Sequence, residues 1–120
     1  MAAEDGVPSA FAEQLALLRA EFARRHAQTL AELELRLAEQ GADVTPALLH
    51  EVHDLLHRLA GSGGSFGFHA LSRQARELEL VARTWLQAAR PLDEPAWQAW
   101  KNGVRALAQM LGPDPQRPAQ

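Results

Sequence analysis

Three histidines in one short stretch are the residues best able to carry chemistry in this chain. They are His50, His53 and His57. Imidazole is a nucleophile, a proton acceptor and a metal ligand near neutral pH. The sequence contains no cysteine, which excludes disulfides, thiolate metal sites and cysteine nucleophiles. The imidazole nitrogens of these histidines are therefore the candidate reactive groups of the chain.

The residues around His57 have the spacing of an amphipathic helix. At about 100° per residue, six apolar side chains fall within an arc of about 120°. His57 points about 140° away from the middle of that arc, on the side shared by His50, His53, Ala60 and Gly61. We expect His57 to project into solvent from a helix whose other face is buried. The six apolar residues are Leu48, Leu49, Val52, Leu55, Leu56 and Leu59.

Glycine and serine follow His57 at high density. The segment Gly61-Ser62-Gly63-Gly64-Ser65-Phe66-Gly67 holds four glycines, and each weakens a helix by up to about 1 kcal/mol relative to alanine. The high glycine content has two explanations. The segment forms the end of the helix and a turn, or it keeps the surface beside the histidine free of side chains so that another protein's backbone can approach. The two explanations are compatible.

The stretch from His57 to Gly67 resembles the signature of the histidine-containing phosphotransfer (HPt) family. In that signature a histidine is followed by glycine at the fourth position, small residues, glycine at the tenth position and leucine at the fourteenth. The downstream Leu78-Glu79 resembles the family's Leu-Glu pair on the next helix. The signature positions are His57, Gly61, Ser62, Gly67 and Leu71.

This resemblance implies that His57 accepts a phosphoryl group from an aspartate of a receiver domain and passes it to a response regulator. The partners would be receiver domains of hybrid sensor kinases and of response regulators. The chain would need no cofactor of its own, because Mg²⁺ sits on the receiver. No autonomous kinase activity is expected, since the glycine run lacks the lysine of a phosphate-binding loop.

Further residues are predicted to support this site. Ala60 stands where the family often has a lysine that helps neutralise the phosphate, and Glu79 is expected to be structural rather than catalytic. Phosphate or partner support is predicted for Arg58, Gly61, Ser62 and Gly64, and partner docking for His53, Ala60, Arg73 and Arg76.

Two other functions fit the same residues. His53-Asp54-Leu55-Leu56-His57 imitates the His-Glu-x-x-His zinc motif with Asp for Glu, and His50 adds a possible third ligand. A catalytic zinc site lacks a clear downstream ligand and a substrate cleft, so surface metal binding is the alternative. The second is a helical docking module that binds a receiver or kinase without carrying phosphate.

The elements that hold these residues are predicted to be four helices in an all-α, up-down bundle. Their expected ranges are about 9–40, 46–62, 68–90 and 94–111, with a flexible tail at 112–120 and one domain over 1–120. Thr45-Pro46 and Asp93-Glu94-Pro95 are helix start signals. The first helix is longer than the others and is expected to project past them. Its predicted buried stripe is Phe11, Leu15, Leu18, Phe22, His26, Leu30, Leu33 and Leu37.

Composition narrows the class of protein. The 120 residues carry a net charge of -3, which is not the basic footprint of a nucleic-acid-binding protein. The sequence shows neither a signal peptide nor an apolar run of the roughly 20 residues that a membrane helix needs. We expect a soluble, cytoplasmic monomer that binds neither nucleic acid nor membrane. The Met start and Pro-rich end favour a free-standing protein.

Overall fold

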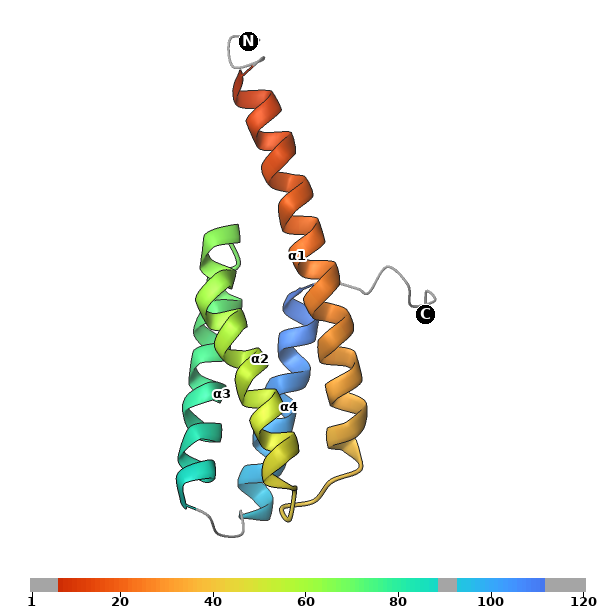
Figure 1. Ribbon diagram of the computed structural model, residues 1–120, viewed down its shortest axis with the longest axis vertical. Helices are drawn as coiled ribbons and strands as arrows, with labels where there is room; N and C mark the ends of the chain where they lie inside the picture. Colours follow the sequence, from red (N-terminus) through yellow and green to blue (C-terminus); the bar gives the residue numbers. More distant parts are fainter. Residues whose placement is uncertain (1–6, 89–92, 112–120) are drawn as a thin grey trace.

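The computed structural model describes residues 7–88 and 93–111 and forms the predicted up-down four-helix bundle (Figure 1). Successive helices run in opposite directions, and these described residues contain no strand. The predicted tail at 112–120 and the expected end of the third helix lie outside the described residues. The helices are α1 (Val7–Ala38), α2 (Pro46–Gly63), α3 (His69–Ala88) and α4 (Glu94–Met110), with the short 3-10 helix η2 (Gly64–Phe66) after α2.

Both predicted start signals form helix caps. The side chain of Thr45 accepts a hydrogen bond from the backbone N–H of Leu48 at 3.3 Å. Asp93 accepts one from the N–H of Ala96 at 3.1 Å. Each cap satisfies a backbone donor that has no partner within the helix. The sequence therefore determines where α2 and α4 begin.

The core is made from the predicted stripes of α2, α3 and α4 together with the part of the α1 stripe from Phe22 to Leu37. All six apolar residues of α2 are buried, as are the inward-facing residues of α4. Trp85, Trp97 and Trp100 form an aromatic cluster, with ring centroids 5.5–6.2 Å apart. The Trp100 indole N–H donates to the carbonyl of Leu78 at 3.0 Å. This packing anchors one face of α2, so its outer face is carried on a rigid support.

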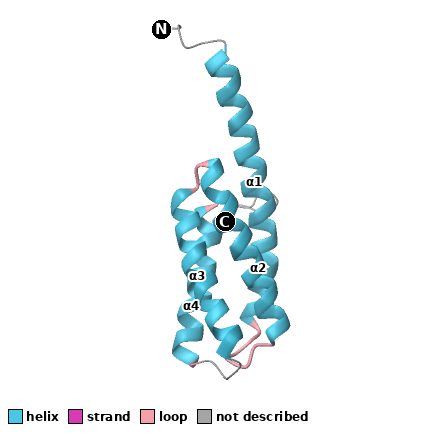
Figure 2. Ribbon diagram, turned by 60° about the vertical axis from the view of Figure 1, so that its left-hand side comes forward, coloured by secondary structure: helices cyan, strands magenta, loops and turns pink. Residues whose placement is uncertain are grey.

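The first helix is buried over only part of its length. Its 32 residues span about 48 Å, whereas the 17 residues of α4 span about 25 Å. The N-terminal part of α1 therefore projects past the bundle, as predicted (Figure 2). The prediction that Phe11, Leu15 and Leu18 are buried is wrong, because no other described helix reaches their level and all three are exposed.

Two contacts hold the glycine-rich turn between α2 and α3. The Ser72 hydroxyl donates to the carbonyl of Ala60 at 2.6 Å. A Cβ added at Gly63 would lie 3.3 Å from Leu71 Cδ2, so glycine allows these helices to pack closely here. Gly67 ends the turn with φ +88°, a conformation that glycine adopts without strain.

None of the helices in the described residues is long and apolar enough to cross a membrane.

The exposed and the buried parts of the α1 stripe should differ sharply in their effect on stability. Phe22 is 4% exposed and packs on Phe66 and Phe68, with centroids 4.9 and 5.5 Å away. Phe22→Ala should lower the free energy of unfolding by about 3–5 kcal/mol. Phe11, which is 68% exposed, is the matched control. Phe11→Ala should change the free energy of unfolding by less than about 0.5 kcal/mol. Urea unfolding followed by circular dichroism measures both, and equal losses would contradict the assigned core.

Candidate functional site

His57 stands on the outer face of α2, as predicted. Its side chain is 70% exposed, whereas Leu56 and Leu59 on the same helix are fully buried. The ring is therefore accessible to another protein, but its backbone is held in place by the core.

A buried carboxylate from α3 orients the His57 ring. His57 Nδ1 lies 2.7 Å from Glu79 Oε2, and the Glu79 side chain is only 4% exposed. An ionised carboxylate can only accept hydrogen bonds, so Nδ1 carries the proton and donates it. In the neutral form of the ring, the other nitrogen, Nε2, then has a free lone pair. The Arg83 guanidinium donates to the same carboxylate oxygen at 2.9 Å.

Glu79 remains ionised although it is buried. Burial alone would raise the pKa of its carboxyl group. The hydrogen bond from His57 and the nearby charges of His57, Arg83 and His53 outweigh burial and lower the pKa below its ordinary value. The carboxylate therefore supplies a fixed negative charge beneath the exposed imidazole near neutral pH.

His53 lies one helical turn from His57 and is wedged between α2 and α3. Its side chain is 17% exposed, and its ring stacks on that of His57 with centroids 6.5 Å apart. Its Nδ1 lies 3.2 Å from Asp54 Oδ1, and its Nε2 lies 3.7 Å from Glu79 Oε2. Most of the His53 ring is thus part of the packing under the site, with only an edge on the predicted docking surface.

The glycines after His57 have different roles. Gly61 lies about 6 Å further along the helix and about 40° around it; a Cβ added there would meet nothing within 4 Å. Gly63 is buried against α3. Gly64 is half-buried and lies on the same face as His57, about 10 Å along the helix. Gly61 is therefore the glycine that leaves open surface directly beside the ring.

Three predicted site residues do not come to the His57 ring. Ala60 is 5% exposed, so its predicted place on the docking surface is wrong; α3 covers it. Ser62 lies about 140° around the helix from His57. Arg58 lines a groove between α1 and α2 with Thr29. Neighbours in a helical sequence point in different directions, which separates these residues from the ring.

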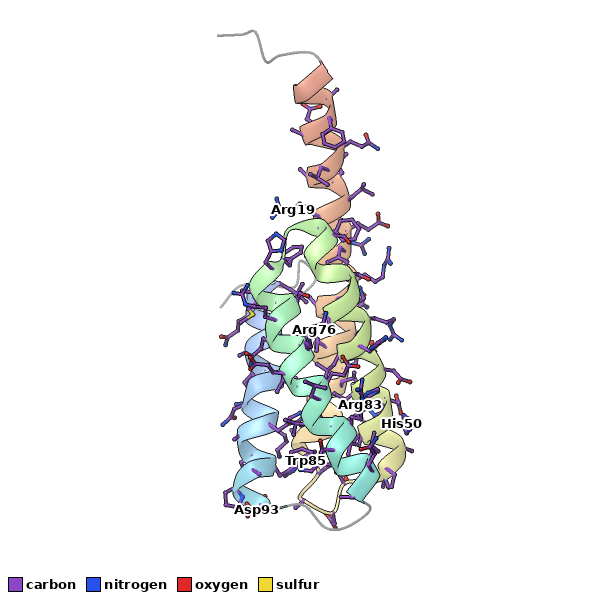
Figure 3. All side chains as sticks on the ribbon, turned by 90° about the vertical axis from the view of Figure 1, so that its left-hand side faces the viewer. Arg19, His50, Arg76, Arg83, Trp85 and Asp93 are labelled. Atoms are coloured by element: carbon purple, nitrogen blue, oxygen red, sulfur yellow. The ribbon has the colours of Figure 1, made fainter. Side chains whose placement is uncertain are left out.

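The arginines of α3 border the site more closely. Ser72 bonds the backbone at Ala60 and Glu79 bonds the ring of His57, so Arg76 lies along α3 between these two contacts. Arg76 and Arg83 point to the same side of α3 as Glu79, within about 60° of it, and Arg73 is further round. Figure 3 views this face, with Arg76 and Arg83 along α3 and His50 on α2.

Sequence reasoning missed the direct roles of Glu79 and Arg83. The signal was a charged residue beside the buried Leu78 on the apolar side of α3, since a carboxylate in a core needs partners. Arg83, four residues later, has the spacing of a helical ion pair.

The three histidines do not gather around one point. His57 Nδ1 is engaged by Glu79, whereas ligand atoms of His50, His53 and Asp54 lie within 4.8 Å of one another. The metal-ligand set available on the surface therefore differs from the predicted set of three histidines.

In a comparison with protein-family models, the model of the Hpt domain matches residues 12–110 of the chain. The chain belongs to the Hpt domain family. The match covers all of α2, α3 and α4 and most of α1. Hpt domains act in histidine phosphotransfer within phosphorelays and interact with receiver domains. Comparisons with curated proteins and with solved structures gave no match.

The Glu79 carboxylate should make the stability of this Hpt domain dependent on pH. Because the pKa of Glu79 is lowered from 4.5 in the folded chain, its ionisation stabilises the fold above about pH 4.5, and this stabilisation is lost as pH falls through the lowered value. Glu79→Gln should cost about 1.5–3 kcal/mol of unfolding free energy at pH 7 and flatten its decline in acid.

Urea unfolding between pH 3 and pH 7 measures this profile. Glu51→Gln is the control, because Glu51 is also paired with an arginine, Arg36, but on the exposed surface. Its pH profile should follow the wild type closely, since solvent screens such pairs. A Glu79→Gln profile parallel to that of the wild type would show that the buried carboxylate contributes no such linkage.

Proposed function

We propose that this Hpt domain carries a phosphoryl group on Nε2 of His57 between receiver domains. The observation that carries the proposal is the bond from His57 Nδ1 to the buried Glu79 carboxylate, which leaves Nε2 as the free nucleophilic nitrogen on an exposed ring. Position, tautomer and accessibility of the ring all suit an attack on a partner's phosphoryl group.

The transfer is an in-line displacement at phosphorus. The Nε2 lone pair attacks the phosphorus of a receiver aspartyl phosphate, the N–P bond forms, and the P–O bond to the aspartate breaks. The aspartate leaves as a carboxylate and keeps the bonding electron pair. The phosphorylated ring is cationic because Nδ1 keeps its proton, and the Glu79 carboxylate, which accepts that proton's hydrogen bond, stabilises the charge.

The same geometry serves the reverse step, in which a second receiver aspartate attacks the phosphohistidine and His57 leaves as neutral imidazole. The direction of flow is then set by the partners, a hybrid sensor kinase receiver supplying the group and a response regulator taking it. Mg²⁺ bound to the receiver neutralises the transferring phosphoryl group. Ala60 has no positive charge to take the place of the lysine frequent at that position. Arg83, which donates to the same Glu79 oxygen that His57 contacts, is an arginine of α3 close to the ring.

Phosphoryl transfer should depend on His57 alone among the exposed histidines. Incubated with a phosphorylated receiver, wild type should acquire an acid-labile label and His57→Gln none, because glutamine lacks a nucleophilic nitrogen. His69→Gln, an exposed histidine on α3, is the control and should be labelled like wild type. Labelling retained in His57→Gln would refute the assignment.

The same assay distinguishes a phosphoryl carrier from a docking module that never carries phosphate. Such a module would bind the receiver and remain unlabelled in the wild type. Binding measured in parallel by calorimetry therefore distinguishes loss of docking from loss of chemistry.

Transfer should also require the open surface at Gly61. A side chain there meets nothing within the protein, so Gly61→Arg should keep the helix content while blocking the partner's approach. We expect transfer at least tenfold slower, a loss of about 1.4 kcal/mol or more in transition-state stabilisation.

Ala99→Arg, at an exposed position on α4, is the control for added bulk and charge and should transfer normally. Gly61→Ala should have a much smaller effect than arginine. Normal transfer by Gly61→Arg would show that partners do not approach over Gly61.

A further inference from the structure

A second cluster of ligating side chains lies on α2, on the side of His53 away from His57. His53 Nδ1 is 3.2 Å and His50 Nδ1 is 3.9 Å from Asp54 Oδ1, and the three ligand atoms lie within 4.8 Å of one another. Tetrahedral ligands at zinc bond lengths of about 2.0–2.2 Å are about 3.3 Å apart. Small rotations of the exposed His50 and Asp54 side chains would therefore bring all three atoms to one ion.

The donor types select a class of ion. Two imidazole nitrogens and one carboxylate oxygen suit Zn²⁺ and neighbouring divalent transition metals, whereas Mg²⁺ and Ca²⁺ prefer sites made of oxygen. His50 and Asp54 are exposed, so water can complete the coordination from the solvent side. The helix supplies the three side chains at positions i, i+3 and i+4, which lie on one face.

The buried edge of His53 supplies a separate observation. Within the described part of the chain, His53 Nε2 is the one buried side-chain polar atom without a hydrogen-bond partner. It lies 3.7 Å from Glu79 Oε2. A histidine that binds metal through one nitrogen carries its proton on the other and commonly donates it to a carboxylate. Metal on Nδ1 would place a proton on Nε2, facing Glu79, and a small approach of the two side chains would then give this atom the partner that it lacks.

We propose that His50, His53 and Asp54 bind one divalent transition-metal ion of the Zn²⁺ type, with Glu79 accepting the Nε2 proton of His53. Glu79 positions the ligand and does not touch the ion. The site is distinct from His57, whose Nδ1 is already bonded to Glu79. The ion would be bound by side chains other than His57, so zinc binding and phosphoryl transfer are tested by different variants.

Calorimetric titration of the full chain, purified without a histidine tag and stripped with chelator, tests the site with ZnCl2 as the probe. We expect one ion per chain in the wild type and at least tenfold weaker binding in both His50→Ala and Asp54→Ala. His69→Ala removes an exposed histidine elsewhere and should bind zinc like the wild type. Circular dichroism of each variant checks that the bundle is intact.

Glu79→Gln tests the role of the buried carboxylate. It should weaken zinc binding about 10–100-fold, whereas Glu51→Gln on the exposed surface of α2 should leave it unchanged. Phosphoryl transfer by His57 is measured separately, so failure of one proposal does not imply failure of the other.

Two results would overturn the site. The first is a wild type that binds no zinc, or binds it no more tightly than His50→Ala. The second is binding abolished by His57→Gln and unaffected by His50→Ala, which would assign the ion to the His53 and His57 pair.

Discussion

The hydrogen bond between His57 and Glu79 connects the exposed site to the interior of the bundle. A carboxylate this deeply buried is tolerated only when it is paired and hydrogen-bonded, and here its partners are His57, Arg83 and the nearby His53. The same bond that keeps Glu79 ionised also determines which nitrogen of His57 faces solvent. The ionisation of Glu79 and the orientation of the His57 ring therefore depend on the same contact.

The second helix combines two tasks on opposite faces. Its apolar residues are packed into the core, and its outer face carries the exposed ring of His57, the open surface at Gly61 and the cluster of His50, His53 and Asp54. Because the core holds the backbone, the orientation of His57 needs only one further contact. This division explains how a bundle of four helices holds one exposed side chain in a defined orientation.

Much of this arrangement could be predicted from the sequence. The caps at Thr45 and Asp93, the buried face of α2 and the exposure of His57 follow from local periodicity and capping chemistry. The contacts between helices could not be predicted in this way. Periodicity places Ala60 near His57, but α3 covers it, and a stripe such as that of α1 does not reveal where its neighbouring helices end. Glu79 gains its role only when α3 is laid beside α2.

The exposure that makes His57 accessible to a partner would also leave the proposed phosphohistidine open to water. A phosphoramidate at that nitrogen would be attacked by solvent from the same direction as by an aspartate. In the proposed transfer, hydrolysis of the N–P bond would compete with delivery of the phosphoryl group to the accepting receiver. Under this proposal, the abundance of the accepting receiver would decide how much of the phosphoryl group is delivered and how much is lost to water.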